Sequence, residues 1–508
     1  MLRRLIQMPL IVVLLGLTAL LCWVPAIHAL ALGQHIVARA FFYSGGFLLM
    51  LTVMLALATA AYRPRNVARN HLTTLIGAYV ILPFIMAMPV VQAVPDTTLA
   101  NAWFEMLSSF TTTGATGYES ARLPLSVHLW RALVGWFGGF YILLAAYAVL
   151  APLNLGGAEV ISGRVPGRGA SQTRQITRIA EPAERITRYA LVIFPVYGGL
   201  TLILWVGLLM AGEDSLAALV HAMGTLSTSG ISAGAGPAAS ASGVAGEALI
   251  LIFLIFAVTR RALPFTGLAD RNFALWRDPE LRIAGLLLIV VPMVLVGRHW
   301  LVTHVGEAEG PVVATGSIWA TIWGAVFTAG SFLTTTGYES IYWSATRLWS
   351  GLEAPGMMLL GLAMMGGGVA TTAGGVKLLR VYALFRHGQR ELQRIVHPNS
   401  VGGSGMDARR MRREGAYMAW VFFMLFAMSI AVTILALSMA NLQFQEALVL
   451  AIAAMTTTGP LADVALAQPI GYGQLSIPVK AVLGVAMIVG RLETLALIAL
   501  FAPGGWRR

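Results

Sequence analysis

Long apolar stretches alternate with short polar segments along almost the whole chain. A helix needs about 20 predominantly apolar residues to cross the hydrocarbon core of a bilayer. This pattern predicts ten crossings, at residues 8–32, 41–62, 72–94, 129–150, 189–210, 248–258, 283–296, 356–385, 416–439 and 477–501. The sixth and seventh stretches are short for a crossing. Ten crossings would place both ends of the chain on the same side of the membrane.

Composition supports a membrane protein with many crossings. Hydrophobic residues make up 57% of the 508 residues and charged residues only 11%, whereas soluble domains carry about 25% charged residues. Cys22 is the single cysteine, so neither a disulfide framework nor a cysteine metal site is expected. The first apolar run is longer than the apolar core of a signal peptide, about 7–15 residues, which favours a retained helix.

The distribution of charge predicts the orientation. The net charge is +12, and the arginines gather near both ends and in the loops that follow the second, fourth, sixth and eighth crossings. Positively charged loops stay on the cytoplasmic side. We therefore expect both termini in the cytoplasm of a bacterial cell, with the protein in the inner membrane. Because the positive charge is explained by topology, no nucleic-acid partner is expected.

Four short segments of similar chemistry occur on the predicted outer side. They read Thr-Thr-Thr-Gly, Ser-Thr-Ser-Gly, Thr-Thr-Thr-Gly and Thr-Thr-Thr-Gly, and they end at Gly114, Gly230, Gly337 and Gly459. Each follows an apolar stretch too short for a further crossing, at 103–110, 216–226, 318–333 and 447–455. Irregular backbone at membrane depth is tolerated only where protein or a water-filled cavity surrounds it. The pattern therefore predicts re-entrant helices, each followed by a turn.

These features predict an all-α membrane protein with a central pore. Four pseudo-symmetric repeats, each made of a first membrane helix, a pore helix and a second membrane helix, are expected around that pore. We place an N-terminal transmembrane helix pair at 1–65, and the repeats at 66–155, 186–264, 281–386 and 414–503. The third repeat is expected to have a broken second helix.

The four turns are the candidate ion-binding site. Helix C-termini carry about half a negative charge, and rings of backbone carbonyls select cations in membrane proteins. Glycine supplies the positive φ that such a turn needs. The alternative is that each turn is only a helix C-cap with glycine in the left-handed region. The expected selectivity filter consists of Thr112, Thr113, Gly114, Thr228, Ser229, Gly230, Thr335, Thr336, Gly337, Thr457, Thr458 and Gly459. Glu119 and Glu339 follow two of the turns and are expected to concentrate cations in the outer vestibule.

A glycine-rich segment breaks the eighth crossing. Each glycine costs about 1 kcal/mol relative to alanine inside a helix, so a gate is expected at Gly366, Gly367, Gly368, Thr371, Thr372, Gly374 and Gly375. The alternative is close helix packing through small residues. Arg491 lies within the last crossing. It is expected to face the gate as a barrier to cations, or to pair with Glu493 or with carbonyls of the broken helix.

These motifs resemble the TrkH/KtrB/Trk superfamily of potassium transporters, and the TrkH branch most closely. The resemblance is carried by residues 108–117, by 364–377 and by Gly490-Arg491-Leu492-Glu493. It implies one filter glycine per repeat, a loop that obstructs the pore, a homodimer and a TrkA-like cytoplasmic subunit that binds NAD or ATP. Glycine rather than serine at position 114 favours potassium. The second helix of repeat two, at 254–261, departs from the family pattern and leaves its packing in doubt.

We therefore expect potassium uptake through a gated, channel-like pore, with the potassium ion as cargo and membrane lipids around it. The chain carries no nucleotide fingerprint, so bound nucleotide is expected only on the partner. One alternative is a proton- or sodium-coupled potassium symporter, which would need buried carboxylates or a proton relay. A remote alternative is a polytopic membrane enzyme, which would need paired carboxylates or clustered histidines in one pocket. His221 is expected to be structural rather than a proton carrier.

Overall fold

The computed structural model describes residues 8–60, 67–151, 157, 182–234, 236–263, 275, 278–304, 318–350, 352, 355–396 and 413–493. The regular structure in these ranges is helical, without β-strands. Seven of the described helices are long and apolar enough to cross a membrane. They are α2 (Leu10–Ala31), α3 (His35–Ala58), α4 (Val67–Ala93), α6 (Leu125–Ala145, continued by a π-helical turn to Leu150), α8 (Pro182–Met210), α12 (Pro279–His304) and α18 (Arg413–Met439).

The three other predicted crossings are shorter or interrupted. In repeat two, α10 (Gly243–Phe253) and α11 (Ile255–Val258) replace one long helix. In repeat three, α15 (Gly356–Met365) and α16 (Leu378–Val396) are separated by irregular backbone, as the glycines predicted. The last crossing is described as α21 (Ile477–Leu492), and the predicted remainder at 494–501 lies outside the described residues.

Each of the four repeats contains one half-length helix, which lies between its two membrane helices. The half-length helices are α5 (Leu99–Phe110), α9 (Ser215–Ser227), α13 (Ile318–Leu333) and α19 (Phe444–Met455). Helix α5 packs between α4 and α6, α13 packs against α12 and α15, and α19 packs against α18 and α21. Two short helices, α14 (Trp343–Ser350) and α20 (Leu461–Val464), follow the turns of repeats three and four. The order of elements matches the four predicted units, although their exact boundaries stay predictions.

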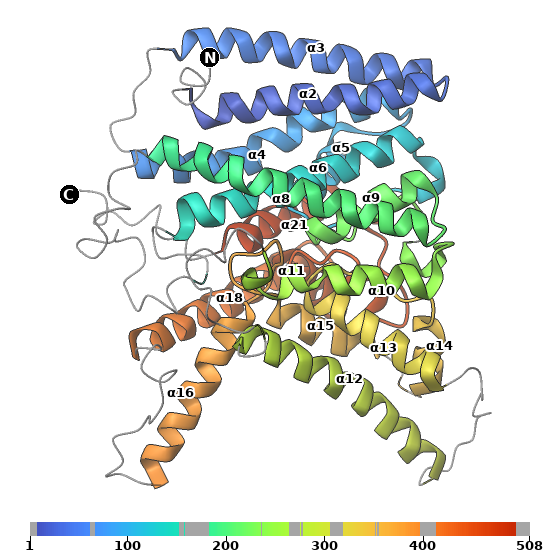
Figure 1. Ribbon diagram of the computed structural model, residues 1–508, viewed down its shortest axis with the longest axis vertical. Coiled ribbons are helices and arrows are strands. Elements are labelled where there is room, and N and C mark those ends of the chain that lie inside the picture. The colour runs from blue at the N-terminus through green and yellow to red at the C-terminus, as the bar shows by residue number, and fades with distance from the viewer. Residues whose placement is uncertain are drawn as a thin grey trace.

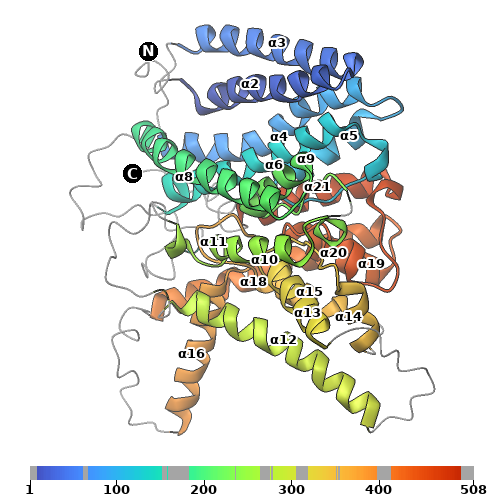
Figure 2. The ribbon, with the colours of Figure 1, turned by 45° about the vertical axis from the view of Figure 1, so that its right-hand side comes forward.

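The first two helices form a separate layer on one flank. Helices α2 and α3 run side by side and cover α4 and α6, which Figures 1 and 2 show from two directions. The far end of α2 is tied to the start of α6, where His28 Nδ1 and Ser126 Oγ are 2.8 Å apart.

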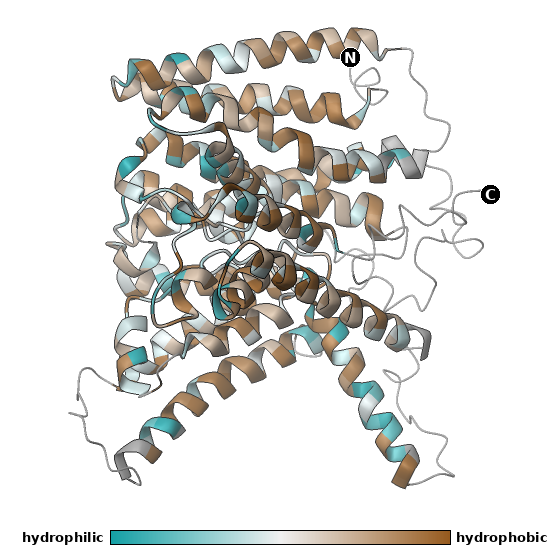
Figure 3. Ribbon diagram, turned by 180° about the vertical axis from the view of Figure 1, so that it is seen from behind, coloured by the Kyte–Doolittle hydropathy of each residue, from teal (hydrophilic) through white to brown (hydrophobic). Residues whose placement is uncertain are grey.

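Burial separates a central helix from the peripheral ones. In its most apolar window, α6 is 89% buried, whereas α3, α8, α12 and α18 are each 28% buried. The exposed faces of these peripheral helices are apolar, as expected for contact with lipid tails. Helices α12 and α16 diverge on the flank opposite α3, and α16 carries hydrophilic residues along its second half before a hydrophobic last turn (Figures 1 and 3). The described part of the chain therefore surrounds its four half-length helices with membrane-spanning ones.

Candidate ion-binding site

The four half-length helices end in the same backbone conformation. In each of the four turns the second residue has a positive φ: 56° at Thr112, 52° at Thr228, 59° at Thr335 and 55° at Thr457. The amide of the third residue then donates to the carbonyl five residues earlier, as from Thr113 to Ser108 and from Thr458 to Ala453, both at 2.8 Å. This bond belongs to the Schellman type of helix cap. The capping interpretation is thus locally correct, but threonine rather than glycine occupies the left-handed position of the cap.

In three of the turns, the fourth residue has a conformation that requires glycine. Gly114, Gly230 and Gly337 have φ values of 74°, 62° and 85°. Gly459 lacks a positive φ, which corrects the expectation for the fourth turn. Its neighbour Pro460 explains the difference, because a residue before proline is confined to extended conformations.

These four glycines close the turns into one ring, which we call the loop ring (111–114, 227–230, 334–337 and 456–459). A methyl group on Gly114 would overlap the carbonyl oxygen of Ser229, and one on Gly230 would overlap that of Thr336. Gly337 in turn abuts the ring of Pro460. The contacts therefore run from each repeat to the next.

The ring is closed between repeats four and one. The amide of Gly459 donates to the carbonyl oxygen of Thr113 at 2.6 Å, and a methyl group on Gly459 would overlap the backbone of Ala115. Turns that are more than 100 residues apart in sequence thus meet around a single axis. The alternative in which the turns lie apart, each serving only its own helix, does not fit these contacts.

The first and third hydroxyl groups of each turn bind one another. Thr111 Oγ1 donates to Leu107 O at 2.8 Å and lies 2.8 Å from Thr113 Oγ1. The equivalent hydroxyl pairs are Ser227 with Ser229 at 2.9 Å, Thr334 with Thr336 at 3.1 Å, and Thr456 with Thr458 at 3.3 Å. These side chains hold the shape of the turn, which leaves backbone carbonyls and the second hydroxyl as candidate ion ligands.

The second hydroxyl differs among the repeats. The hydroxyl groups of Thr112 and Thr457 are buried without a hydrogen-bond partner. Thr228 Oγ1 donates to Ser227 O at 2.7 Å, and Thr335 Oγ1 accepts from the amide of Gly374 at 2.7 Å. Buried polar atoms are seldom left unsatisfied in a folded protein. The hydroxyl oxygen atoms of Thr112 and Thr457 therefore remain candidate ligands for a cation at the ring.

The interrupted helix of repeat three contacts the loop ring through the irregular segment 366–377, which we call the intramembrane loop. Thr372 Oγ1 donates to Leu226 O at 3.1 Å, just before the turn of repeat two. A methyl group on Gly374 would overlap Thr456 O in repeat four. With the bond from Gly374 to Thr335, the intramembrane loop touches three of the four repeats at the ring. The residues predicted for a gate are thus together and adjacent to the ring.

The backbone of the intramembrane loop is sharply bent. Gly366 and Gly375 have φ values of 71° and 75°, and their backbones pack against each other too closely for a side chain. The amides of Val376 and Lys377 donate back to Met364 and Met365, each at 3.0 Å. The glycine-rich stretch therefore makes a compact loop rather than a close helix–helix contact.

Repeat two supplies an anchor that the sequence did not predict. The carbonyl oxygen of Ala257 accepts from the Gly368 amide at 2.9 Å and from Thr371 Oγ1 at 3.0 Å. This carbonyl is available because α11 ends at Val258, and the last four carbonyls of a helix lack partners within it. The departure from the family pattern at 254–261 thus coincides with a second interrupted helix, whose end holds the intramembrane loop.

Two arginines, Arg380 and Arg491, lie buried next to the intramembrane loop. Arg491 Nη1 donates to Thr372 O at 2.6 Å, while its Nε and Nη2 atoms are buried without partners. Glu493 pairs instead with Arg380 at 2.7 Å. Of the pairings expected for Arg491, the structure therefore contains the one with a carbonyl of the broken helix and not the one with Glu493.

Arg380 was not predicted as a buried residue of this site, because in the sequence it lies only a few residues after the interruption of the helix. It is fully buried, and its guanidinium lies 3.6 Å from the centre of the Phe422 ring on α18. Lys377 is also buried and donates to Ala373 O. A cavity of about 30 Å³ bordered by Thr371, Lys377 and Arg491 remains between these groups, which is room for about one water molecule.

Three acidic residues follow the turns of the loop ring in sequence: Glu119, Glu339 and Asp463. Glu119 is exposed, and Glu339 lies partly buried near Asp463. Burial and the Asp463 charge raise the pKa of the Glu339 carboxyl. Asp463 is exposed to solvent, and partial desolvation by the neighbouring protein raises the pKa of its carboxyl to about 6. The proximity of Asp463 to Glu339 depends on repeats three and four being neighbours.

Three further carboxylates are buried behind the outer half of the site. Glu105 forms an ion pair with Arg131 at 2.6 Å and accepts from the Gly117 amide at 3.0 Å. Glu247 accepts three hydrogen bonds, from Trp323 Nε1, Ser340 Oγ and the Ile341 amide, at 2.6 to 2.8 Å. Each of these carboxylates fixes a segment that leads into or out of a turn.

His221 lies on α9 against the third of these carboxylates. Its Nδ1 contacts the Glu213 carboxylate, and its ring meets Tyr338 edge-on at 5.6 Å. Glu213 also accepts from Ser242 Oγ at 3.2 Å. These contacts tie α9 to repeat three and to the start of α10, which suits the structural role expected for this histidine.

Four half-helices that converge on one closed ring, with an intramembrane loop in contact with that ring, define a multi-pass membrane transport protein. The family model TrkH, described as cation transport protein, matches residues 38–505. The chain belongs to the TrkH family, and the predicted family and all-α fold class are confirmed.

Several known proteins resemble the chain over most of their length. It is 30% identical over 438 residues to the Trk system potassium uptake protein TrkH of Escherichia coli (strain K12), covering 85% of this chain and 84% of that protein. It is 26% identical over 471 residues to the protein of the same name from Halomonas elongata, covering 91% and 92%. The crystal structure of the potassium transporter TrkH from Vibrio parahaemolyticus matches with a TM-score of 0.78 and 26% identity over 99% of both chains.

Proposed function

We propose that this chain takes up potassium ions across the inner membrane of a bacterium through a gated, channel-like pore. The observation that carries the proposal is the loop ring, in which each glycine abuts the turn of the next repeat. The names of the relatives, potassium uptake proteins and a potassium transporter, support the choice of ion.

The ring binds the ion through oxygen atoms. Four helix C-termini point their partial negative charge at the axis, and carbonyl oxygens replace the water around a monovalent cation. The absence of charged side chains in the four turns suits a monovalent ion better than a divalent one, which prefers carboxylates. Because the membrane potential contributes about 2.3 kcal/mol per charge per 100 mV, accumulation of potassium needs no chemical reaction, and the protein is not an enzyme.

The intramembrane loop and Arg491 act as the gate. The loop lies against the ring on its inner side, and Arg491 adds positive charge to the path of a cation. Opening requires the loop to leave the carbonyl of Ala257 and the hydroxyl of Thr335, which hold it now. The cavity of about 30 Å³ beneath the loop is too small for a hydrated ion, so the present arrangement corresponds to a closed gate.

The expected orientation and partners complete the proposal. Both termini lie in the cytoplasm, because the arginine-rich segments share one side. The working form is a homodimer whose gate is moved by a TrkA-like cytoplasmic subunit that binds nucleotide. The relatives are named as proteins of a Trk system, which supports the existence of such a partner.

Ion flux into liposomes tests the proposal. Purified protein is reconstituted, and rubidium or potassium uptake is compared with sodium uptake for the wild type, Gly114→Ser and Gly46→Ser. Gly46 lies on α3 with open space around it, so Gly46→Ser controls for the added hydroxyl. Gly114→Ser places a side chain against the Ser229 carbonyl and is expected to reduce the preference for potassium, while Gly46→Ser leaves it unchanged.

The same assay separates the alternatives. Flux that persists without a proton or sodium gradient supports a channel-like pore, whereas flux that requires either gradient favours the symporter. Equal ion preference in the wild type and Gly114→Ser would refute the assignment of the filter. Because the gate is closed without its partner, absence of flux from the wild type counts against transport only if Gly374→Ala, which displaces the intramembrane loop, shows no flux either; that result would favour the enzyme.

A further inference from the structure

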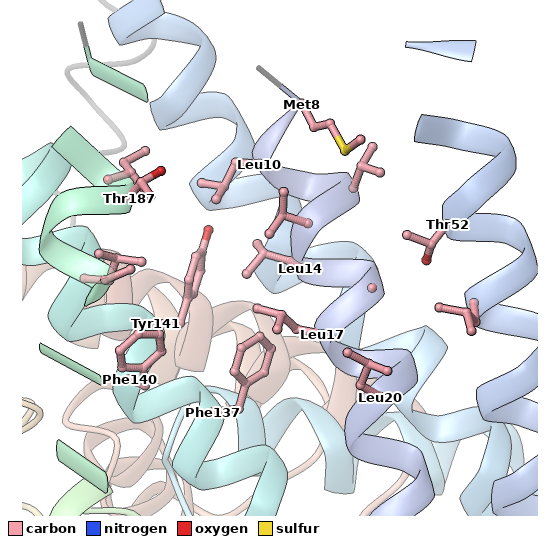
Figure 4. Close-up of a pocket in the computed structure, with 17 residues that line it drawn as sticks. Met8, Leu10, Leu14, Leu17, Leu20, Thr52, Phe137, Phe140, Tyr141 and Thr187 are labelled. Atoms are coloured by element: carbon pink, nitrogen blue, oxygen red, sulfur yellow. The ribbon is translucent and has the colours of Figure 1, made fainter. Parts of the chain in front are cut away.

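An apolar cleft separates the N-terminal helix layer from the pore repeats. It has a volume of about 500 Å³ and is lined mainly by α2, α3, α6 and α8. Figure 4 shows Leu14 and Leu17 of α2 facing Phe137 and Tyr141 of α6 across it. This volume is within the range of about 300–1,000 Å³ found for sites that hold small molecules.

The length and position of the cleft match one half of a bilayer. Its lining on α2 extends from Leu10 to Leu20, which is about 15 Å at 1.5 Å per residue. The hydrocarbon core of a membrane is about 30 Å thick, so the cleft spans about one leaflet. All four lining helices are candidate membrane spans. A cleft with this depth and an apolar lining is filled by hydrocarbon rather than by water.

Two unsatisfied polar groups lie at or beside the cleft. Tyr141 lines it, and its hydroxyl is buried without a hydrogen-bond partner. Arg185 directly precedes the lining residues Ile186 and Thr187 in the first turns of α8, and its Nε is also buried without a partner. A guanidinium binds phosphate oxygens well. An arginine at the end of a membrane span, next to an acyl-sized cleft, therefore indicates a lipid with a phosphate headgroup.

The floor of the cleft is connected to the first pore helix. The Tyr141 ring stacks on Phe110, the last residue of α5, at 5.8 Å, and Tyr79 packs on the same ring at 4.9 Å. Phe110 directly precedes the first turn of the loop ring. Whatever fills the cleft against Tyr141 thus supports the packing behind the loop ring.

We propose that the cleft binds a phospholipid of the leaflet that meets the arginine-rich loops. One acyl chain lies between α2 and α6, and the headgroup phosphate is bound by Arg185. This assignment goes beyond ion transport and does not depend on which ion passes the ring.

Lipid retention and thermal stability test the site in the full-length protein. Phospholipid that remains with the protein after detergent washing is measured by mass spectrometry, and the melting temperature is measured with added phosphatidylglycerol. Leu17→Trp fills the cleft, and Arg185→Gln removes the headgroup contact. Ile27→Trp, on an exposed part of α2 outside the cleft, and Arg188→Gln, at an exposed position of α8, are the matched controls.

The wild type and both controls are expected to retain phospholipid and to melt at a higher temperature when phosphatidylglycerol is added. Arg185→Gln should weaken this binding roughly tenfold, as for loss of a charge-assisted hydrogen bond, and Leu17→Trp should abolish it. Because Arg185→Gln leaves the apolar packing intact, it remains informative if Leu17→Trp does not fold.

Two ligands that each lack one part of a phospholipid test the headgroup contact and the acyl-chain contact separately. Diacylglycerol, which lacks the phosphate, and glycerol phosphate, which lacks the tails, should each stabilise less than phosphatidylglycerol. Equal stabilisation by diacylglycerol would overturn the role of Arg185, and equal stabilisation by glycerol phosphate would overturn the acyl site. If Leu17→Trp retains as much phospholipid as the wild type, the cleft holds no lipid. If Leu17→Trp instead loses dimers without losing lipid, the cleft holds a second copy of the chain.

Discussion

The amide nitrogen of Gly374 lies 2.7 Å from the hydroxyl oxygen of Thr335, to which it donates a hydrogen bond. Gly374 belongs to the intramembrane loop, and Thr335 belongs to the loop ring. This single bond joins the proposed gate directly to the proposed filter. Because a buried amide without a partner costs about 1–3 kcal/mol, the bond favours the arrangement in which the intramembrane loop lies against the ring.

Thr335→Val is expected to increase partner-independent flux. Valine has the shape of threonine but cannot accept the bond, so the closed arrangement loses stability relative to an open one. A difference of about 1.4 kcal/mol corresponds to roughly a tenfold rise in the open population. Rubidium uptake into liposomes without any cytoplasmic partner measures this rise. Thr335→Ser keeps the hydroxyl and should remain near the wild-type rate, and a rise of equal size in Thr335→Ser would contradict the role of the bond.

Gly374→Ala is expected to displace the intramembrane loop from the ring. Its methyl group would overlap the carbonyl oxygen of Thr456, which is backbone, and also the hydroxyl oxygen of Thr457. The loop must move, so we expect flux without the partner to rise above that of the wild type by about the same factor as for Thr335→Val.

Gly361→Ala is the matched control for this change. Gly361 lies on α15, before the break, with open space around it. Alanine there should leave flux unchanged and stabilise the helix by up to about 1 kcal/mol. If Gly374→Ala also left flux unchanged while melting normally, the contact between loop and ring would have no part in gating.

The features that the sequence predicted correctly are those that depend on short, local patterns of residues. The four Thr-Gly segments end half-length apolar stretches, so the pore helices and their turns follow from composition and length. The glycines between Gly366 and Gly375 make a continuous helix costly, and the structure interrupts the helix there. A local pattern of this kind also carries the resemblance to the TrkH family.

The features that the sequence did not predict depend on contacts between distant residues. Arg380 and Glu493 are separated by 113 residues, and nothing in either neighbourhood indicates that they pair. The left-handed conformation of Thr112 is also unexpected, because β-branched residues rarely adopt a positive φ. It recurs in all four turns, where the cap hydrogen bonds and the neighbouring turns hold it. Such strain is visible only once the ring has been assembled.

Flux at low cation concentration is expected to fall as the outer solution is acidified. The Asp463 carboxyl, with its pKa raised to about 6 by desolvation, is charged above that pH and neutral below it. Lowering the pH from about 7.5 to about 5.5 therefore removes negative charge from the outer vestibule. Loss of this focusing should reduce subsaturating flux by roughly threefold.

Asp463→Asn provides the control for this pH effect. The variant should start at the reduced flux and show little further change with pH, whereas Asp214→Asn, at an exposed site before α9, should behave like the wild type. A pH profile that is identical in Asp463→Asn and the wild type would assign the effect to another group.

Glu493→Gln is expected to destabilise the inner end of the protein strongly. Arg380 is fully buried beneath the Phe422 ring, and Glu493 is its charged partner at 2.7 Å. Removing one charge from a buried pair costs about 3–5 kcal/mol, because the other is left uncompensated. The loss appears as a lower temperature for the loss of monodisperse protein in a thermal scan.

Replacing both Arg380 and Glu493 distinguishes the contribution of the ion pair to stability from that of the groups around it. Arg380→Met with Glu493→Leu removes both charges and keeps apolar volume, so the double variant should be more stable than Glu493→Gln alone. The reverse order would mean that Arg380 is stabilised mainly by Phe422 and by the carbonyl of Val376, to which its Nη1 donates at 3.3 Å. Since Leu378, two residues before Arg380, bonds back to Gly367, loss of the pair should also loosen the intramembrane loop, and partner-independent rubidium flux in Glu493→Gln should exceed that of the double variant.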